Sequence, residues 1–198
     1  MLKICYIMIK LSENGIIGKG GERTVYLHPI EKKYCIKIPN EQNSRSQIAM
    51  LREIKYLNRH QNYLKHLSKY QYTTSTNLGK GFVFDLVRDY NGCISKTLQF
   101  YMEKGKVKIL NHLNEKISII YDDLLERKAV VHDLKPRNIL VQWHSNINYN
   151  LILVDGFGNS DFIKICDYSH KFAYAKLNRH FSRLDRMLES LVNNYSNY

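Results

Sequence analysis

Two polar motifs, each beside a short apolar run, constrain what this chain can fold into. The first motif, residues 131–138, reads Val-His-Asp-Leu-Lys-Pro-Arg-Asn and precedes the apolar residues 139–141. The second motif, Asp-Gly-Phe-Gly at residues 155–158, follows the apolar residues 151–154. Short apolar runs bounded by turn-forming residues predict strands. We therefore expect one strand beneath the first loop and a second strand that brings Asp155 to the end of a hairpin.

The polar residues of these motifs are the types that phosphoryl transfer needs. Asp133 would orient or deprotonate an attacking hydroxyl group, and Lys135 would reach the transferred phosphate. Asn138 and Asp155 would offer oxygen ligands to Mg²⁺. The spacing Asp-x-Lys-x-x-Asn resembles the catalytic loop of protein kinases. Alternatively, the first motif only caps a turn around its proline and the second is a plain hairpin turn. Two motifs in the right order favour the catalytic interpretation.

The N-terminal half contains candidates for nucleotide binding. Residues 18–25 fit G-x-G-x-x-x-x-V, so Gly18, Gly20 and Val25 would cover the phosphates, while Arg23 stands where protein kinases usually have a third glycine. Lys37 follows twelve residues after Val25 within an alternating strand candidate, and it resembles the lysine that contacts the α- and β-phosphates. We predict that Lys37 binds the nucleotide.

Glu53 is the candidate partner of this lysine. Apolar residues recur with a helical period at positions 50, 51, 54 and 57, which leaves Glu53 available to pair with Lys37 and hold it in place. The alternatives are a solvated Lys37 on an edge strand, a second acidic candidate at Glu41, and a Glu53 that pairs within its own helix or not at all.

The hydrophobic pattern predicts an α+β fold in one compact domain over residues 1–198. The resemblance of the motifs above to those of kinases implies that this domain is bilobal and kinase-like. An antiparallel sheet with one helix would form an N-lobe at residues 8–88. A hinge at residues 89–92, which equally fits a plain loop, would lead to a truncated, mostly helical C-lobe at residues 93–198. The expected N-lobe strands are 8–17, 23–28, 33–38, 71–76 and 81–87, with a turn at 79–81, and the expected helices are 44–60, 97–104, 107–127 and 176–192.

Charge and cysteine usage narrow the partners. Thirty Lys and Arg residues against eighteen Asp and Glu residues give a net charge of +12, which favours anionic partners. The basic residues are dispersed and no nucleic-acid-binding motif is evident, so we do not expect nucleic acid to be the partner.

The four cysteines form no C-x-x-C pair, and no apolar run is long enough to span a membrane. Free thiols without a membrane span predict a cytoplasmic protein.

Several segments together resemble one bacterial family. Residues 9–13, 17–20, 35–38, 52–57, 81–92 and 134–140 are similar to the PhoP regulatory network protein YrbL family, whose fold is protein-kinase-like. The resemblance begins near Met8, so we expect residues 1–7 to come from an upstream start codon. The wider superfamily implies ATP and Mg²⁺ as cofactors. The resemblance to the YrbL family itself implies a link to a PhoP-regulated envelope response.

Departures from the protein-kinase pattern bear on the acceptor. His132 directly precedes Asp133, the metal motif reads Asp-Gly-Phe-Gly, and only 43 residues follow Asp155. That tail leaves little room for a subdomain that binds protein substrates. We therefore expect an ATP- and Mg²⁺-dependent phosphotransferase that acts on a small molecule, a lipid-linked sugar or itself. The alternative is a catalytically inactive pseudokinase that binds nucleotide or a partner.

Overall fold

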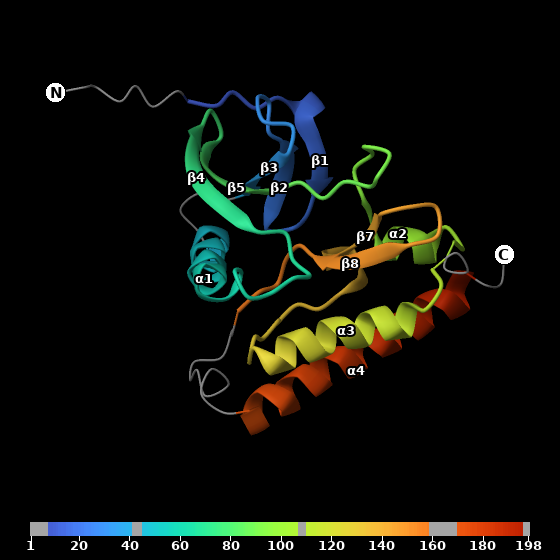
Figure 1. Cartoon of the computed structure of the whole chain (residues 1–198). Coiled ribbons are helices and arrows are strands. Elements are labelled where there is room, and N and C mark those ends of the chain that lie inside the picture. Colours follow the sequence, from blue (N-terminus) through green and yellow to red (C-terminus); the bar gives the residue numbers. More distant parts are fainter. Residues whose placement is uncertain (1–7, 41–44, 107–109, 159–169, 196–198) are drawn as a thin grey trace. The chain divides into compact units, whose positions relative to one another are not determined.

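The computed structural model describes residues 8–40, 45–106, 110–158 and 170–195. The predicted α+β class is confirmed, because two antiparallel sheets and four α-helices account for most of the described residues. The chain divides into two compact units (Figure 1). The first unit contains residues 1–55 and 68–86, and the second contains residues 56–67 and 87–198.

The first unit is built on a five-stranded sheet. Its strands lie in the order β1 (Ile16–Lys19), β2 (Arg23–Leu27), β3 (Tyr34–Pro39), β5 (Gly79–Asp85) and β4 (Tyr70–Thr76), and every pairing is antiparallel. The central strands carry the most buried side chains. Ile36 and Val83 are fully buried and pack with Ile9, Leu11, Tyr26 and Ile38 in the core of this unit.

Two details of the predicted sheet are wrong. Residues 8–17 do not form one strand, because Ile9 makes only an isolated bridge with Thr76 and a 3₁₀ turn at Glu13–Gly15 precedes β1. The β4–β5 turn lies at residues 77–78, and Gly81 belongs to β5. A Cβ atom on Gly81 would lie 2.7 Å from Cγ2 of Ile36. This glycine therefore permits close packing within the sheet and does not form the turn.

Helix α1 (Arg45–His60) follows β3 and matches the predicted helix at nearly all positions, residue 44 lying outside the described residues. Met50, Ile54 and Leu57 are buried, as the helical period predicted, whereas Leu51, also part of that period, is 46% exposed. Glu53 is also buried on this helix, at 3% exposure. A carboxylate at such depth requires a charged or hydrogen-bonding partner.

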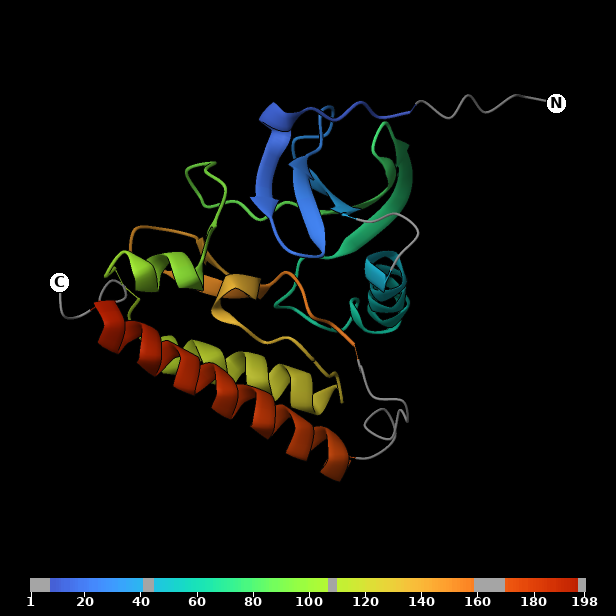
Figure 2. The ribbon, with the colours of Figure 1, turned by 180° about the vertical axis from the view of Figure 1, so that it is seen from behind.

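The second unit combines a three-stranded sheet with three helices. Strands β6 (Lys96–Thr97), β7 (Ile139–Trp143) and β8 (Tyr149–Leu153) pair in that order, so the predicted hairpin of the two apolar runs is confirmed. Helix α2 (Leu98–Glu103) follows β6 directly. Helices α3 (Leu113–Glu126) and α4 (His170–Tyr195) lie side by side (Figures 1 and 2). The Tyr121 hydroxyl donates to Oδ1 of Asn178 at 2.6 Å and ties α3 to α4.

The predicted hinge at residues 89–92 forms a hairpin loop of the second unit. A bridge between Arg88 and Ile94 closes the loop, and the backbone N–H of Gly92 donates to the carbonyl of Asp89 at 2.9 Å. The Asp89 carboxylate accepts hydrogen bonds from the Ser95 hydroxyl and from the backbone N–H of Trp143. These bonds fasten the loop to the end of β7.

Among the described residues, no helix is long and apolar enough to cross a membrane.

Candidate functional site

The loop before β7 is held in shape by Asn138. A 3₁₀ turn, Pro136–Asn138, follows Lys135, with proline at a position where a helical turn needs no N–H group. The Asn138 amide nitrogen donates to the backbone carbonyl of Asp133 at 2.9 Å and to its Oδ2 at 3.1 Å. Asn138 is buried, whereas the Asp133 side chain is 31% exposed. The buried amide thus fixes a carboxylate that remains open to solvent.

Two cations flank the Asp133 carboxylate. Nζ of Lys135 lies 2.6 Å from its Oδ1, and Nη2 of Arg137 lies 4.0 Å from its Oδ2. Both cations therefore lie within electrostatic reach of the carboxylate. The structure therefore brings the two predicted catalytic residues, Asp133 and Lys135, into direct contact.

Backbone hydrogen bonds join the second motif to the first. The N–H of His132 donates to the carbonyl of Gly156 at 2.8 Å, and the N–H of Gly158 donates to the carbonyl of Val130 at 3.0 Å. Between these bonds, Val131 and Phe157 form an antiparallel bridge. The second motif begins seventeen positions after the end of the first, and the two thus lie side by side in the second unit.

The two predicted metal ligands are positioned by the same backbone network. The N–H of Val154, the residue before Asp155, donates to the carbonyl of Asn138 at 3.0 Å. Asp155 is half-buried, and its Oδ1 accepts a hydrogen bond from the N–H of Gly156 at 2.7 Å. Among the described residues, no cluster of three His, Cys, Asp or Glu side chains suits a metal ion. Mg²⁺ needs no such cluster, because it binds through one or two protein oxygens together with substrate phosphates and water. An amide and a carboxylate fit this requirement.

Three of the predicted nucleotide-binding residues of the first unit form one row across the sheet. Gly18 on β1 lies opposite Val25 on β2, and Val25 lies opposite Lys37 on β3. Gly20 lies in the β1–β2 turn, where its N–H donates to the carbonyl of Arg23 at 2.9 Å. The glycine-rich segment is therefore a hairpin next to the strand that carries the lysine.

Asn40 supports this glycine-rich hairpin and was not predicted. Its side-chain amide donates to the carbonyls of Gly20 at 2.9 Å and Gly21 at 2.8 Å. Its Oδ1 accepts a hydrogen bond from the Thr24 hydroxyl at 3.0 Å. An asparagine directly after a strand is typical of many loops, so the sequence gives no signal for this role.

The buried charges of the first unit include one pair that sequence analysis missed. Lys37 is 4% exposed, with its Nζ 3.9 Å from the centre of the Phe84 ring. Oε2 of Glu53 accepts a hydrogen bond from Nη1 of Arg23 at 2.7 Å. The available signal was the arginine itself, which replaces the glycine usual at this position. The predicted Lys37–Glu53 pair stays a prediction.

Comparisons with known proteins agree with the resemblance carried by these motifs. The PhoP regulatory network protein YrbL family model matches residues 9–189. The chain is 29% identical over 180 residues to the uncharacterized protein YrbL of Escherichia coli strain K12 and, equally, to that of Shigella flexneri. Each alignment covers 89% of this chain and 86% of the relative. This chain belongs to the PhoP regulatory network protein YrbL family.

Proposed function

We propose that the protein is a kinase-like phosphotransferase that uses ATP and Mg²⁺, with the two units acting as the lobes of a bilobal kinase-like domain. The observation that carries this proposal is the junction of the two motifs in the second unit. Asn138 holds Asp133 through its side chain, and its backbone binds the residue before Asp155. In this proposal the junction would supply the base and both metal ligands that phosphoryl transfer requires.

The residues of this junction divide the chemistry. The acceptor hydroxyl oxygen attacks the γ-phosphorus of ATP, the bond to the β-phosphate oxygen breaks, and ADP leaves. Asp133 orients the hydroxyl and takes its proton, while Lys135 offsets charge on the transferred group. Asn138 and Asp155 would hold Mg²⁺, which neutralises charge on the phosphates when bound. The Asn138 amide nitrogen points to Asp133, so its oxygen is the atom that would face the metal.

In the first unit, Lys37 would hold the α- and β-phosphates with Glu53 behind it, beneath the hairpin that contains Gly18, Gly20 and Val25. The burial of Lys37 and Glu53 and the alignment of Gly18, Val25 and Lys37 across three strands support this assignment. We further propose a cytoplasmic protein within a PhoP-regulated envelope response, with a small molecule, a lipid-linked sugar or the protein itself as acceptor.

The Asp133→Asn variant tests the catalytic role. Asparagine keeps the size of the side chain but takes up no proton, so formation of ADP from Mg²⁺-ATP should fall by about 10²- to 10⁴-fold. Asp122→Asn, on an exposed position of α3, is the matched control and should keep the wild-type rate. Equal rates in wild type and Asp133→Asn would overturn the proposed base.

A catalytically inactive module that binds nucleotide or a partner is the second candidate. The contact between Lys135 and Asp133 at 2.6 Å favours it, because the lysine occupies the carboxylate oxygen that would otherwise receive a proton. This candidate predicts that the wild type binds ATP without forming ADP. It also predicts that Asp133→Asn leaves ATP affinity unchanged.

A further inference from the structure

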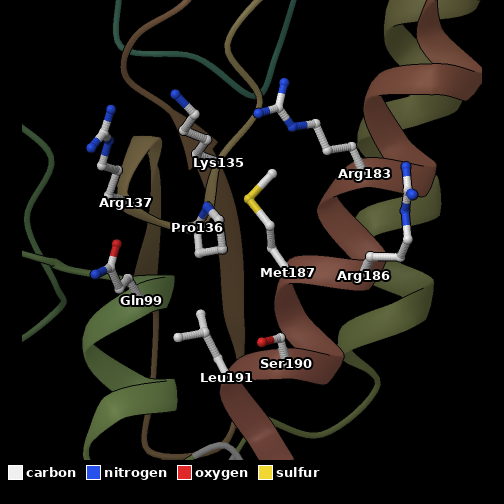
Figure 3. Close-up of a pocket in the computed structure, with 9 residues that line it drawn as sticks. All are labelled: Gln99, Lys135, Pro136, Arg137, Arg183, Arg186, Met187, Ser190 and Leu191. Atoms are coloured by element: carbon white, nitrogen blue, oxygen red, sulfur yellow. The ribbon is translucent and has the colours of Figure 1, made fainter. Parts of the chain in front are cut away.

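A cationic cavity of about 530 Å³ lies between the Asp133 loop and α4, within the second unit (Figure 3). Lys135, Pro136 and Arg137 line it from the loop. Arg183 and Arg186 line it from α4, together with apolar residues that include Met187 and Leu191. Among the described residues, four cations and no carboxylate line this cavity. Asp133 lies two positions before Lys135 in the same loop.

The two α4 arginines are available to a ligand. Both are exposed, and within the described part of the chain neither forms an ion pair with an aspartate or glutamate. Arg186 donates from Nε to the carbonyl of Ser182 at 3.2 Å, which leaves its two terminal nitrogens for other contacts. Guanidinium groups match the oxygens of a phosphate and often bind them in pairs.

Around His180, on the same helix as Arg183, neighbouring cations create a positive potential. Burial lowers the pKa of His180 below its ordinary value of 6.5, and the neighbouring charges of Lys176, Arg179, His132 and Arg183 lower it further. A proton is disfavoured where other cations crowd the site. An anion would be favoured there for the same reason.

The cavity adjoins the carboxylate of the proposed base. Lys135 lines the cavity and also lies 2.6 Å from Oδ1 of Asp133, and Arg137 lines it while lying 4.0 Å from Oδ2. Figure 3 shows the charged ends of Lys135, Arg137 and Arg183 gathered at one end, with Leu191 at the other. A ligand with an anionic group and a less polar part fits this arrangement.

We propose that this cavity binds a phosphate group already present on the acceptor, so that the substrate is a hydroxyl compound carrying a phosphate. The identification of this ligand as the acceptor rests on the proposed function. The bound phosphate takes no part in the bond changes; it positions the molecule so that its hydroxyl reaches Asp133. The phosphate belongs to a soluble monoester or to a lipid headgroup, and the two sources are separable by experiment.

The test is calorimetric titration of the full-length chain with glucose 6-phosphate, with glucose as the uncharged comparison and no ATP present. The double variant Arg183→Gln/Arg186→Gln should bind at least tenfold more weakly, because it loses two phosphate-binding side chains. Lys104→Gln/Lys171→Gln removes the same charge from exposed positions outside the cavity and should stay within twofold of wild type. The single variant Arg183→Gln should also bind more weakly than the wild type. Its circular-dichroism melting curve should match that of the wild type, which shows that the loss of binding does not come from a folding defect.

A second arm uses phosphatidylcholine vesicles with and without phosphatidic acid. Binding to glucose 6-phosphate that the Arg183→Gln/Arg186→Gln variant loses assigns the cavity to soluble phosphates. Vesicle binding alone, lost in the same variant, assigns it to a lipid headgroup. Absence of both, or equal losses in the lysine control, overturns the inference. A parallel ATP titration separates this failure from failure of the proposed function, because Arg183 and Arg186 are not among the proposed nucleotide-binding residues. ATP binding without phosphate binding in the cavity would overturn this inference alone, whereas absence of ATP binding would contradict the proposed function.

Discussion

At the scale of single residues, Gly156 is the position where the two motifs press together most closely. Its φ of +83° is a conformation that side chains rarely adopt, and a Cβ atom there would lie 2.8 Å from the Asp133 carbonyl oxygen. We predict that Gly156→Ala lowers the free energy of unfolding by about 1–3 kcal/mol, measured by urea denaturation.

Gly21→Ala is the matched control for this substitution. A Cβ atom on Gly21 meets nothing within 4 Å, so alanine there should change the free energy of unfolding by less than about 1 kcal/mol. Equal effects of the two substitutions would show that the close approach of Gly156 to Asp133 is not a constraint on the fold.

His28 predicts a pH dependence of stability. Its ring is buried, and Nδ1 accepts hydrogen bonds from the N–H groups of Glu31 at 2.8 Å and Ile30 at 3.3 Å. Burial lowers the pKa of His28 below 6.5, and Glu31 opposes this shift. The unfolded chain therefore binds the proton more tightly, so stability is lost as the pH falls below about 6.5.

His28→Asn keeps an acceptor that does not titrate, and its free energy of unfolding should fall less than that of the wild type between pH 7 and 5. Parallel curves would contradict this role.

At the scale of elements, the buried pair between β2 and α1 joins strand to helix in the first unit. The side chains of Arg23 and Glu53 are 12% and 3% exposed. We predict that Arg23→Gln lowers the free energy of unfolding by about 2–3 kcal/mol, because the Glu53 carboxylate loses a buried charged donor. Glu22→Gln is the control: its contact with Arg23 is 3.8 Å long and its side chain is 64% exposed, so the cost should be at most about 1 kcal/mol. Thermal unfolding of both variants measures their losses of unfolding free energy. Equal losses would show that the pair of Arg23 and Glu53 adds nothing to stability.

The elements also show what local pattern can and cannot predict. The β7–β8 hairpin was predicted because short apolar runs bounded by turn-forming residues indicate strands, and α1 was predicted because its apolar residues recur with a helical period. The helix expected at 107–127 begins only at Leu113, after His112 adopts a left-handed conformation with φ of 60°, while residues 107–109 lie outside the described residues. Helix α4 begins six residues earlier than expected, and its extra turns expose Phe172 and Tyr174, so no apolar stripe marked them.

At the scale of the whole molecule, the order of the motifs predicted much of the candidate site. Asp133, Asn138 and Asp155 were identified because their loops follow or precede recognisable strands. Arg23 and Asn40 were not identified as supporting residues, because their partners lie on α1 or in the neighbouring hairpin. Such pairings leave no periodic pattern by which they could be recognised in a single sequence. The cationic cavity was missed for the same reason, because Arg183 and Arg186 on α4 lie about fifty residues after the loop beside them in sequence.

Part of the excess of basic residues behind the net charge of +12 is concentrated at one site in the structure. The sequence suggested dispersed basic residues, but four of them line one cavity next to Asp133. Charge gathered in a concave site attracts anions more effectively than the same charge spread over a surface. This concentration of charge supports our proposal that the partners are anionic, a nucleotide and a phosphorylated acceptor.

The measurement that tests the proposed function most directly is isothermal titration of the protein with ATP, with and without Mg²⁺, repeated on Asp155→Ala. We expect Mg²⁺ to strengthen ATP binding in the wild type and to have no effect in Asp155→Ala, with Asp122→Asn behaving as the wild type. If the folded wild-type protein does not bind ATP, or if Asp155→Ala keeps the full Mg²⁺ dependence, the proposed nucleotide and metal site is wrong.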